Sequence, residues 1–222
     1  MLCQIVLFDG FDPLDVIAPY EVLFAGGMAA PGTLRVELVS AEGPREVPSG
    51  SGLLTLRATA ALDPRRADLV VVPGAVGPLG DPAGAGDAGS GDSVPAVLAR
   101  SLRTGLPALL GEALGRPGTT VATVCGGSAI LAAAGLIAGR HATTNHLGVH
   151  LLEAAGVIAV GARVVDDGDL VTGAGVTSGL DLGLYLLERE IGPRIAHAVE
   201  QLFAHERRGT VWRAAGPVPA GF

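Results

Sequence analysis

Three short apolar runs, each closed by a turn-forming sequence, most constrain the fold of this chain. They are residues 2–8, 69–72 and 119–124. Runs this short and this continuously apolar are typical of strands buried on both faces. Helical patterns lie between them, and strands that alternate with helices form a parallel sheet covered by helices on both faces. The sequence therefore predicts an α/β fold with a doubly wound, mostly parallel sheet.

The remaining elements follow from hydrophobic periodicity and from turn residues. Alternation predicts a strand over 34–39, a short strand over 141–144, a hairpin within 43–64, and a hairpin around Asp167-Gly168. Gly26-Gly27 is expected to end the first helix. The predicted helices span 14–24, 94–103, 106–114, 128–137, 147–155, 177–191 and 193–206.

The chain length, 222 residues, suits one domain. No internal repeat and no dividing linker is found, so residues 1–208 are expected to form a single α/β domain and residues 209–222 a C-terminal tail. The segment 77–93 is rich in Gly, Ala, Asp and Ser and is predicted to be a surface loop.

The charge balance excludes several functions. The chain has 15 basic and 22 acidic residues and a formal net charge of −7, which leaves no basic surplus to bind nucleic acid. All the basic residues are Arg. The lack of Lys excludes lysine Schiff-base chemistry, including that of pyridoxal phosphate, and the lysine of a phosphate-binding P-loop.

Cysteine and histidine usage predicts no cofactor and no metal. Cys3 and Cys125 form neither a disulfide framework nor a zinc site, and no pair of histidines has reliable metal-ligand spacing. The chain starts without the basic leader of a secretory signal, so we expect a cytoplasmic protein. The uncharged run 117–139 is long enough to span a membrane, but its Thr, Gly and Ser residues predict a buried strand, a turn and a helix.

Cys125 is the strongest candidate for chemistry. It directly follows the apolar run 119–124 and precedes Gly126, Gly127 and a helical segment, which is the strand–turn–helix arrangement of a nucleophile elbow. The helix N-terminus is expected to lower the pKa of the thiol, and amides near Gly126 to hold a developing negative charge. The alternative is a small buried cysteine that only packs, which is the better interpretation of Cys3.

A carboxylate near the start of the first helix is the second candidate. Asp9, Asp12 and Asp15 compete for this role, because Asp9 suits a turn, Asp12 suits a helix cap and Asp15 stands in the first helical turn. Spacing alone does not choose among them. His146 could return toward Cys125 from the loop after the short strand, although a packing role at a helix start explains it equally well.

The chain resembles the ThiJ/PfpI superfamily, which has a class I glutamine-amidotransferase-like fold, and the resemblance covers nearly its whole length. Its opening block and the Ala-Thr-Thr after the cysteine helix are most similar to the isonitrile hydratase branch. The blocks that carry the resemblance are "IVLFDGFDPLDVIAPYEVL", "LVVVPGAVG", "VATVCGGSAILAAAGLIAGRHATTNH" and "LVTGAGVTSGLDLGLYLLE". The resemblance implies a flavodoxin-like sheet and a homodimer with its site near the interface.

Residue by residue, the resemblance places Cys125 at the family nucleophile and Asp15 at the acidic residue beside it. Gly74 and Ala75 match the family's Pro-Gly-Gly turn, whose amides face the site, and Gly126 and Gly127 follow the nucleophile.

Two positions depart from the family pattern. Gly126 replaces the Thr of isonitrile hydratase and the His of protease-like and glyoxalase-like branches. Asn145 stands where a His is common, with His146 shifted by one residue.

These features together predict a cofactor-free, cysteine-dependent hydratase or related lyase acting on a small electrophilic substrate. The isonitrile hydratase resemblance implies conversion of an isonitrile and water to an N-substituted formamide, or a related tailoring reaction of specialised metabolism. One alternative is a glyoxalase-like or deglycase-like enzyme acting on α-oxoaldehydes. Another is a redox sensor without enzymatic activity, in which Cys125 is oxidised to a sulfinic acid beside Asp15. No nucleic acid and no membrane is expected as a partner.

Overall fold

A central eight-stranded sheet organises the protein, as seen in a computed structural model that describes residues 1–79, 92–217 and 220. The strand order is β12-β10-β11-β7-β6-β1-β2-β5, and all neighbours are parallel except β10 and β11. The strands of this sheet are β1 (Leu2–Leu7), β2 (Arg35–Ser40), β5 (Ala60–Ala61), β6 (Leu69–Val72), β7 (Thr120–Val124), β10 (Val164–Asp166), β11 (Leu170–Gly173) and β12 (Trp212–Arg213).

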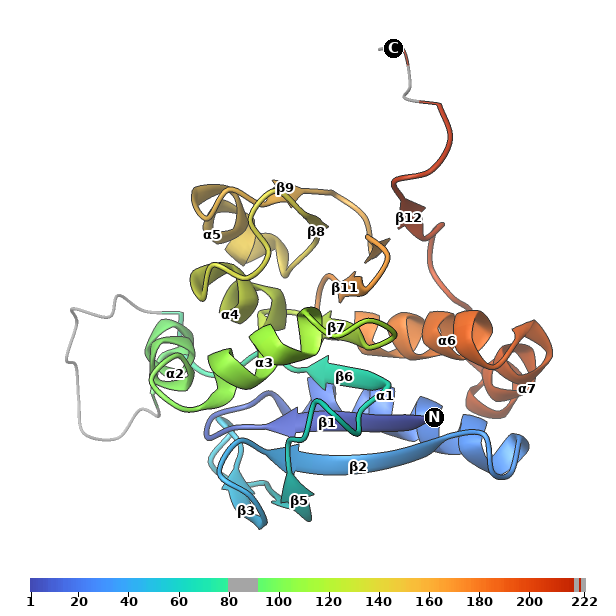
Figure 1. Ribbon diagram of the computed structural model, residues 1–222, viewed down its shortest axis with the longest axis horizontal. Helices are drawn as coiled ribbons and strands as arrows, with labels where there is room; N and C mark the ends of the chain where they lie inside the picture. Colours follow the sequence, from blue (N-terminus) through green and yellow to red (C-terminus); the bar gives the residue numbers. More distant parts are fainter. Residues whose placement is uncertain (80–91, 218–219, 221–222) are drawn as a thin grey trace.

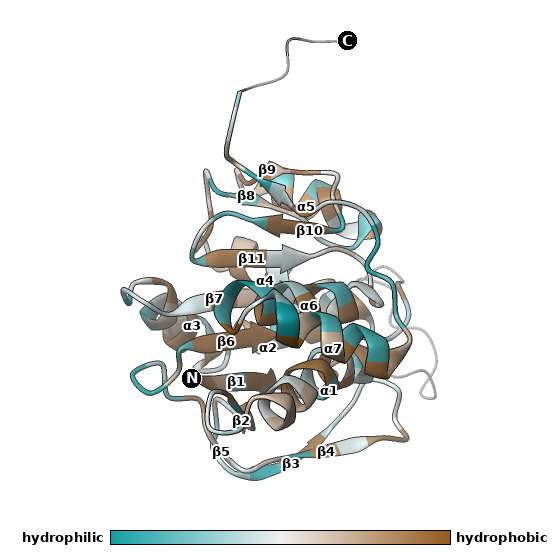
Figure 2. Cartoon of the chain, turned by 90° about the vertical axis from the view of Figure 1, so that its right-hand side faces the viewer, coloured by the Kyte–Doolittle hydropathy of each residue, from teal (hydrophilic) through white to brown (hydrophobic). Residues whose placement is uncertain are grey.

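Helices cover both faces of this sheet (Figures 1 and 2). On one side α1 packs against α6 and α7, and on the other α4 packs against α2, α3 and α5. The helices are α1 (Pro13–Ala29), α2 (Val94–Ser101), α3 (Leu106–Leu114), α4 (Gly127–Ala133), α5 (Val149–Ala154), α6 (Ser178–Glu190) and α7 (Pro193–Phe203). The central strands are apolar, brown in Figure 2, as burial on two faces requires. The doubly wound α/β fold predicted from the sequence is confirmed.

Both predicted hairpins are present. The strands β3 (Arg45–Pro48) and β4 (Thr55–Ala58) pair antiparallel in a small separate sheet, and β10 and β11 form the second hairpin. The predicted strand over 141–144 is shorter, because only β8 (His141–Ala142) pairs, in parallel with β9 (Ile158–Ala159). The predicted helix over 147–155 divides into the 3-10 helix η1 (His146–Gly148) and α5.

The prediction that Gly26-Gly27 ends the first helix is wrong, because α1 continues to Ala29. A Cβ on Gly26 would come within 2.3 Å of the Leu187 side chain, and one on Gly27 within 2.6 Å of the Leu34 carbonyl oxygen. The two glycines therefore let the end of α1 approach α6 and the chain before β2. Close packing outweighs the low helix propensity of glycine here.

The prediction that the cysteine helix extends to residue 137 is also wrong, since α4 ends at Ala133. Gly135 adopts a left-handed backbone with φ +72°, and the Leu136 amide donates to the Leu131 carbonyl over 3.0 Å. This is the Schellman arrangement that closes a helix, and glycine adopts the required φ without strain. The predicted end of α7 at Glu206 shifts to Phe203 for a similar reason, because Ala204 has φ +48°.

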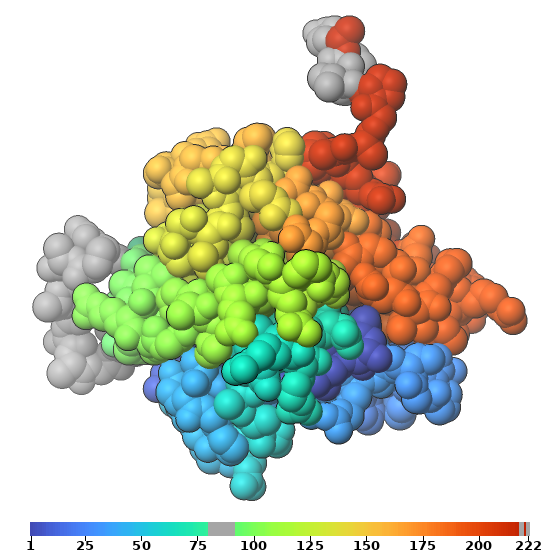
Figure 3. Space-filling view, viewed as in Figure 1, coloured from blue at the N-terminus to red at the C-terminus, as the bar shows by residue number. Residues whose placement is uncertain are grey.

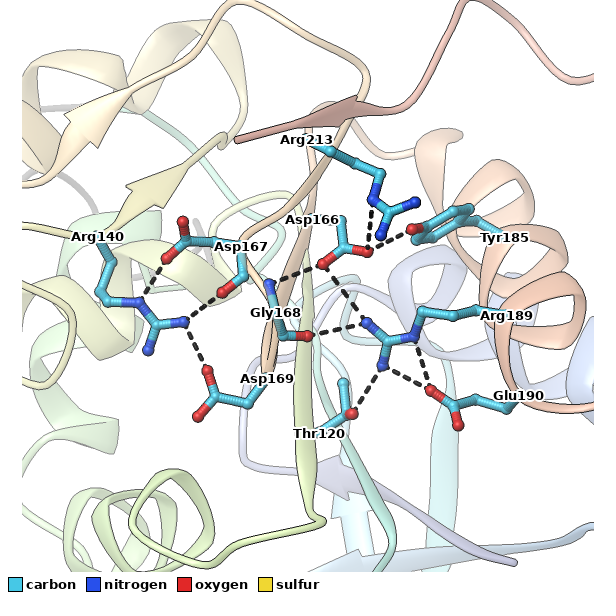
Figure 4. A network of polar contacts seen from close by, with 10 residues as sticks. All are labelled: Thr120, Arg140, Asp166, Asp167, Gly168, Asp169, Tyr185, Arg189, Glu190 and Arg213. Carbon is cyan, nitrogen blue, oxygen red and sulfur yellow. Dashed lines mark hydrogen bonds and ion pairs between the residues drawn. The ribbon is translucent and has the colours of Figure 1, made fainter. Parts of the chain in front are cut away.

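Part of the predicted C-terminal tail joins the sheet. β12 adds to the edge beside β10, and a polar network around the buried Asp166 connects β10, α6 and β12 (Figure 4). The Tyr185 hydroxyl and the Gly168 amide donate to Asp166, and the guanidinium groups of Arg189 and Arg213 lie 3.5 Å and 3.7 Å from it. This network holds the chain after α7 against the body of the domain. The predicted loop 77–93 lies mostly outside the described residues.

Candidate active site

A sharp turn between β7 and α4 presents Cys125 at the carboxyl ends of the parallel strands. Cys125 itself has φ +53°, a conformation that is strained for a side chain other than glycine, and its amide donates to the Gly173 carbonyl over 3.1 Å. A Cβ on Gly127 would lie 2.2 Å from the Val72 carbonyl oxygen, so only glycine lets α4 start this close to β6. The turn has the geometry of a nucleophile elbow.

Asp15 lies next to Cys125 and is fully buried. It stands in the first turn of α1, and its Oδ2 accepts a hydrogen bond of 2.9 Å from the Gly74 amide. Its Oδ1 has no hydrogen-bond partner among the described residues. A Cβ on Gly74 would come within 2.6 Å of the Gly126 nitrogen and 2.9 Å of Asp15 Oδ2, so glycine at position 74 permits this contact.

Burial controls the protonation of this pair. Removal from water raises the pKa of Asp15 to about 8, and repulsion from Asp12 adds to this increase. Hydrogen bonds from the Gly74 amide and the Cys125 thiol lower the pKa and so oppose the increase. Burial and then the charge of Asp15 raise the pKa of the Cys125 thiol to about 12. At neutral pH both groups therefore hold their protons. The prediction that the helix N-terminus lowers the pKa of this thiol is wrong, because desolvation and the neighbouring carboxylate outweigh the amides.

Asn145 is a further neighbour of the sulfur atom, and the sequence alone assigns it no role. Its Nδ2 lies 3.5 Å from Cys125 Sγ, and its Oδ1 accepts a hydrogen bond from the Leu147 amide that caps η1. Together with the Gly126 amide, it lowers the pKa of the thiol and so opposes the burial effect. Thr144 supports the turn by donating its hydroxyl to the Cys125 carbonyl over 2.8 Å. The equivalence of Asn145 with the His of related sequences is the signal that could have found it.

A pocket of about 430 Å³ opens above Cys125, between α2 and the segment that contains η1 and α5. The space-filling view shows the green surface of the segment that contains α2 and α3 next to the yellow surface of the segment that follows Cys125 (Figure 3). The lining of the pocket also includes Ala75, Gly126, Asn145 and His150. The larger apolar side chains that line it are Leu79, Val94, Pro95, Leu98, Leu147 and Leu151.

The remaining predicted site residues lie in the turn after β6, in the first turn of α4 and in η1. The Gly74 amide is directed at Asp15, whereas the Ala75 amide has no backbone acceptor among the described residues. Gly127 is buried in the first turn of α4. His146 does not line the pocket of Cys125. It lines a separate cavity of about 390 Å³ with Glu153, and His150 is the histidine that lines the pocket above the thiol.

The structure also separates the three aspartates that spacing left open. Asp12 caps α1, where its Oδ1 accepts a hydrogen bond of 2.9 Å from the Leu14 amide. Asp9 pairs with Arg45 at 2.7 Å. Asp15 is thus the carboxylate that lies against the thiol, as the family resemblance implies.

The described residues contain neither a cluster of metal-ligating side chains nor a helix that could cross a membrane. No group of three or more His, Cys, Asp and Glu side chains gathers in a way that could hold a metal ion. None of the described helices combines the length and the apolar character needed to cross a membrane.

The fold and site define an α/β protein with a buried carboxyl beside a cysteine at a nucleophile elbow. Residues 98–189 match the model of the DJ-1/PfpI family. The chain is 33% identical over 197 residues to an isonitrile hydratase of Pseudomonas putida, an alignment that covers 88% of this chain and 74% of the relative. The chain belongs to the DJ-1/PfpI family, and the resemblance found in the sequence is confirmed.

Solved structures agree with this assignment. A ThiJ/PfpI family protein from Pseudomonas syringae superimposes with a TM-score of 0.75 at 25% identity, covering 94% of this chain and 76% of that protein. Drosophila melanogaster DJ-1beta superimposes with a TM-score of 0.72 at 18% identity, covering 91% and 97% of the two chains, and shares the fold.

Proposed function

We propose that this protein is a cofactor-free hydratase that converts an isonitrile and water to an N-substituted formamide. The observation that carries the proposal is the position of the Asp15 carboxyl, which is buried beside the Cys125 thiol, and this burial raises its pKa to about 8. Isonitrile hydration needs a nucleophile for the terminal carbon and a proton for the substrate, and this pair supplies both. The similarity to an isonitrile hydratase supports the same reaction.

The first step adds the thiol across the terminal carbon of R–N≡C. Cys125 Sγ forms a bond to this carbon, Asp15 delivers a proton to the carbon, and the thiol proton passes to Asp15. The product is a thioimidate, R–N=CH–S–Cys125, and Asp15 is protonated again. Because proton transfer and bond formation occur together, the step does not need a free thiolate, which the raised pKa of Cys125 makes scarce.

The second step adds water to the thioimidate carbon. Asp15 gives its proton to the substrate nitrogen and takes one from the attacking water, which leaves R–NH–CH(OH)–S–Cys125. The C–S bond then breaks, the hydroxyl proton returns to sulfur through Asp15, and R–NH–CHO leaves. We expect the amides of Ala75 and Gly126, two residues that line the pocket, to stabilise charge on the adduct.

The apolar lining of the pocket favours isonitriles over α-oxoaldehydes. Among the described residues, no Asp, Glu or Arg side chain lines the pocket, and Leu98, Leu147 and Leu151 form much of its wall. Small oxoaldehydes are polar and hydrated, so they gain little from such a wall. An isonitrile with a hydrocarbon substituent gains from burial of that substituent.

A turnover assay with isonitriles tests the proposal. We expect formamide from the wild type, none from Cys125→Ala, and a loss of at least about a hundredfold in Asp15→Asn, which keeps the shape but cannot transfer the proton. No formamide from folded wild-type protein would refute the proposal. Lactate formed from methylglyoxal would then support the oxoaldehyde alternative, and selective oxidation of Cys125 by mild peroxide without turnover would support the sensor.

A second copy of this chain remains the predicted partner. The α1 face that points away from the sheet exposes apolar side chains, which supports an interface there. They are Leu14, Ile17, Phe24 and Met28. Light scattering of the wild type and of a Phe24→Glu variant checks this prediction, with a dimer expected only for the wild type.

A further inference from the structure

The three glycines that surround the site differ in whether their positions have room for a side chain. A Cβ on Gly74 would lie 2.6 Å from a backbone nitrogen, and one on Gly127 would lie 2.2 Å from a backbone oxygen, so neither position tolerates a side chain. Gly126 is different. Its φ of −69° is open to any residue, and its Cβ would meet nothing closer than the Gly74 Cα at 3.7 Å and the Leu98 Cδ1 at 3.9 Å. The fold does not require glycine at position 126.

The missing side chain at Gly126 leaves room where a substrate reacts. Gly126 follows Cys125 directly and lines the pocket, and Leu98 of α2 stands on the other side of this space. When the substrate carbon bonds to Sγ, the substituent of the substrate would therefore lie between Gly126 and Leu98. A side chain at position 126 would occupy the volume in which a branched substituent must fit.

We propose that Gly126 is a specificity-determining residue that admits substrates with a fully substituted carbon next to the reacting group. This inference rests on the proposed function and specifies the substrate class as isonitriles with an apolar tertiary alkyl substituent. Branching at this carbon places three groups around the reacting end, and the space beside Gly126 accommodates the group that would otherwise meet a side chain. Leu98 supplies apolar contact to that group.

The test compares n-butyl isonitrile with tert-butyl isonitrile in the wild type, Gly126→Ala and Gly126→Val. Gly105→Ala is a matched control, because Gly105 also caps a helix with φ −70° and has nothing within 4 Å of its Cβ position. We expect kcat/KM for the tert-butyl compound to fall at least about tenfold more than that for the n-butyl compound in Gly126→Val. The loss in Gly126→Ala should be smaller but of the same kind, and Gly105→Ala should keep the wild-type ratio.

A second readout keeps this inference separate from the reaction itself. Iodoacetamide and 2-iodopropionamide alkylate thiols, and the second is branched at its reacting carbon. We expect Gly126→Val to slow alkylation of Cys125 by the branched reagent at least about tenfold more than by iodoacetamide, whether or not isonitriles are turned over. Alkylation ratios equal to those of the wild type in both Gly126 variants would overturn the inference. A lack of formamide with changed alkylation ratios would refute only the proposed reaction.

Discussion

The carboxyl of Asp15 and the thiol of Cys125 lie next to each other in one buried site, where a second negative charge is strongly disfavoured. Asp15 is fully buried, and Cys125 is nearly so. Burial raises the pKa of both groups, to about 8 for Asp15 and about 12 for Cys125, and the charge of Asp15 further raises that of the thiol. At neutral pH the pair therefore holds two protons. The two groups titrate as one coupled pair.

The raised pKa of Asp15 predicts a pH-dependent stability. The folded protein holds a proton on Asp15 up to about pH 8, whereas the unfolded chain releases it near about pH 4. The stabilisation is complete at low pH and is lost as the pH rises through this window. The side chain at position 15 does not titrate in Asp15→Asn. We therefore expect the free energy of unfolding of this variant, relative to that of the wild type, to rise by up to about 4 kcal/mol between pH 5 and pH 8.

Urea denaturation of both proteins at several pH values measures this difference. Other titrating groups are common to the two proteins, so they cancel when the free energies of unfolding are subtracted. A difference that stays constant across the window would show that Asp15 is ionised in the folded protein, which would also remove it as a proton donor.

The reactivity of Cys125 should depend on Asn145. Asn145→Asp keeps the oxygen that accepts from the Leu147 amide but replaces the nitrogen near Sγ with a negative oxygen. The added charge raises the pKa of the thiol, so we expect iodoacetamide to alkylate Cys125 at least about tenfold more slowly. Mass spectrometry of the Cys125 peptide gives the rate.

Cys3 provides an internal control for this measurement. It is fully buried in β1, and burial strongly raises its pKa, so it should stay unmodified while the protein is folded. Alkylation of Cys3 at the same rate as Cys125 would indicate unfolding. A rate at Cys125 equal to that of the wild type would show that Asn145 does not influence the sulfur.

The order of strands and helices, the elbow and the position of Cys125 are all readable from the sequence, because they follow from local patterns. Short apolar runs indicate β6 and β7, and the glycines after Cys125 mark the turn. The end of α1 is not readable in this way, since Gly26 breaks helices by propensity and its tolerance depends on Leu187 of a distant helix. Spacing also could not choose Asp15, because its contact with Gly74 joins α1 to the end of β6.

The pKa of Cys125 could not be predicted from its position at a helix start. The local rule accounts only for the amides near Gly126 and omits the burial of the thiol and the carboxyl that α1 places beside it. His146 illustrates the same limit on a smaller scale. It follows Asn145 directly, yet the cap on η1 turns it toward a different cavity and leaves His150, one helical turn later, in the pocket.

Gly126 and Gly127 should differ in how strongly the same substitution lowers the stability of the protein. A Cβ at Gly127 would collide with the Val72 carbonyl, so we expect Gly127→Ala to lower the free energy of unfolding by at least about 2 kcal/mol. Gly126→Ala meets only ordinary contacts and should change it by less than about 1 kcal/mol. Thermal and urea denaturation of the two variants check this, and equal losses in both would contradict the distinction between required and free glycines.

Tyr185 should stabilise the end of the sheet through Asp166. Its hydroxyl donates to this buried carboxylate, and burial together with Asp166 raises the pKa of Tyr185 to about 12, so the donor keeps its proton over the ordinary pH range. Tyr185→Phe leaves Asp166 with one donor fewer and should cost about 1–3 kcal/mol in the free energy of unfolding. Tyr20→Phe, at a ring stacked on Phe24, is the matched control and should cost less than about 0.5 kcal/mol. Equal costs in the two variants would show that the Tyr185 hydroxyl contributes nothing through Asp166.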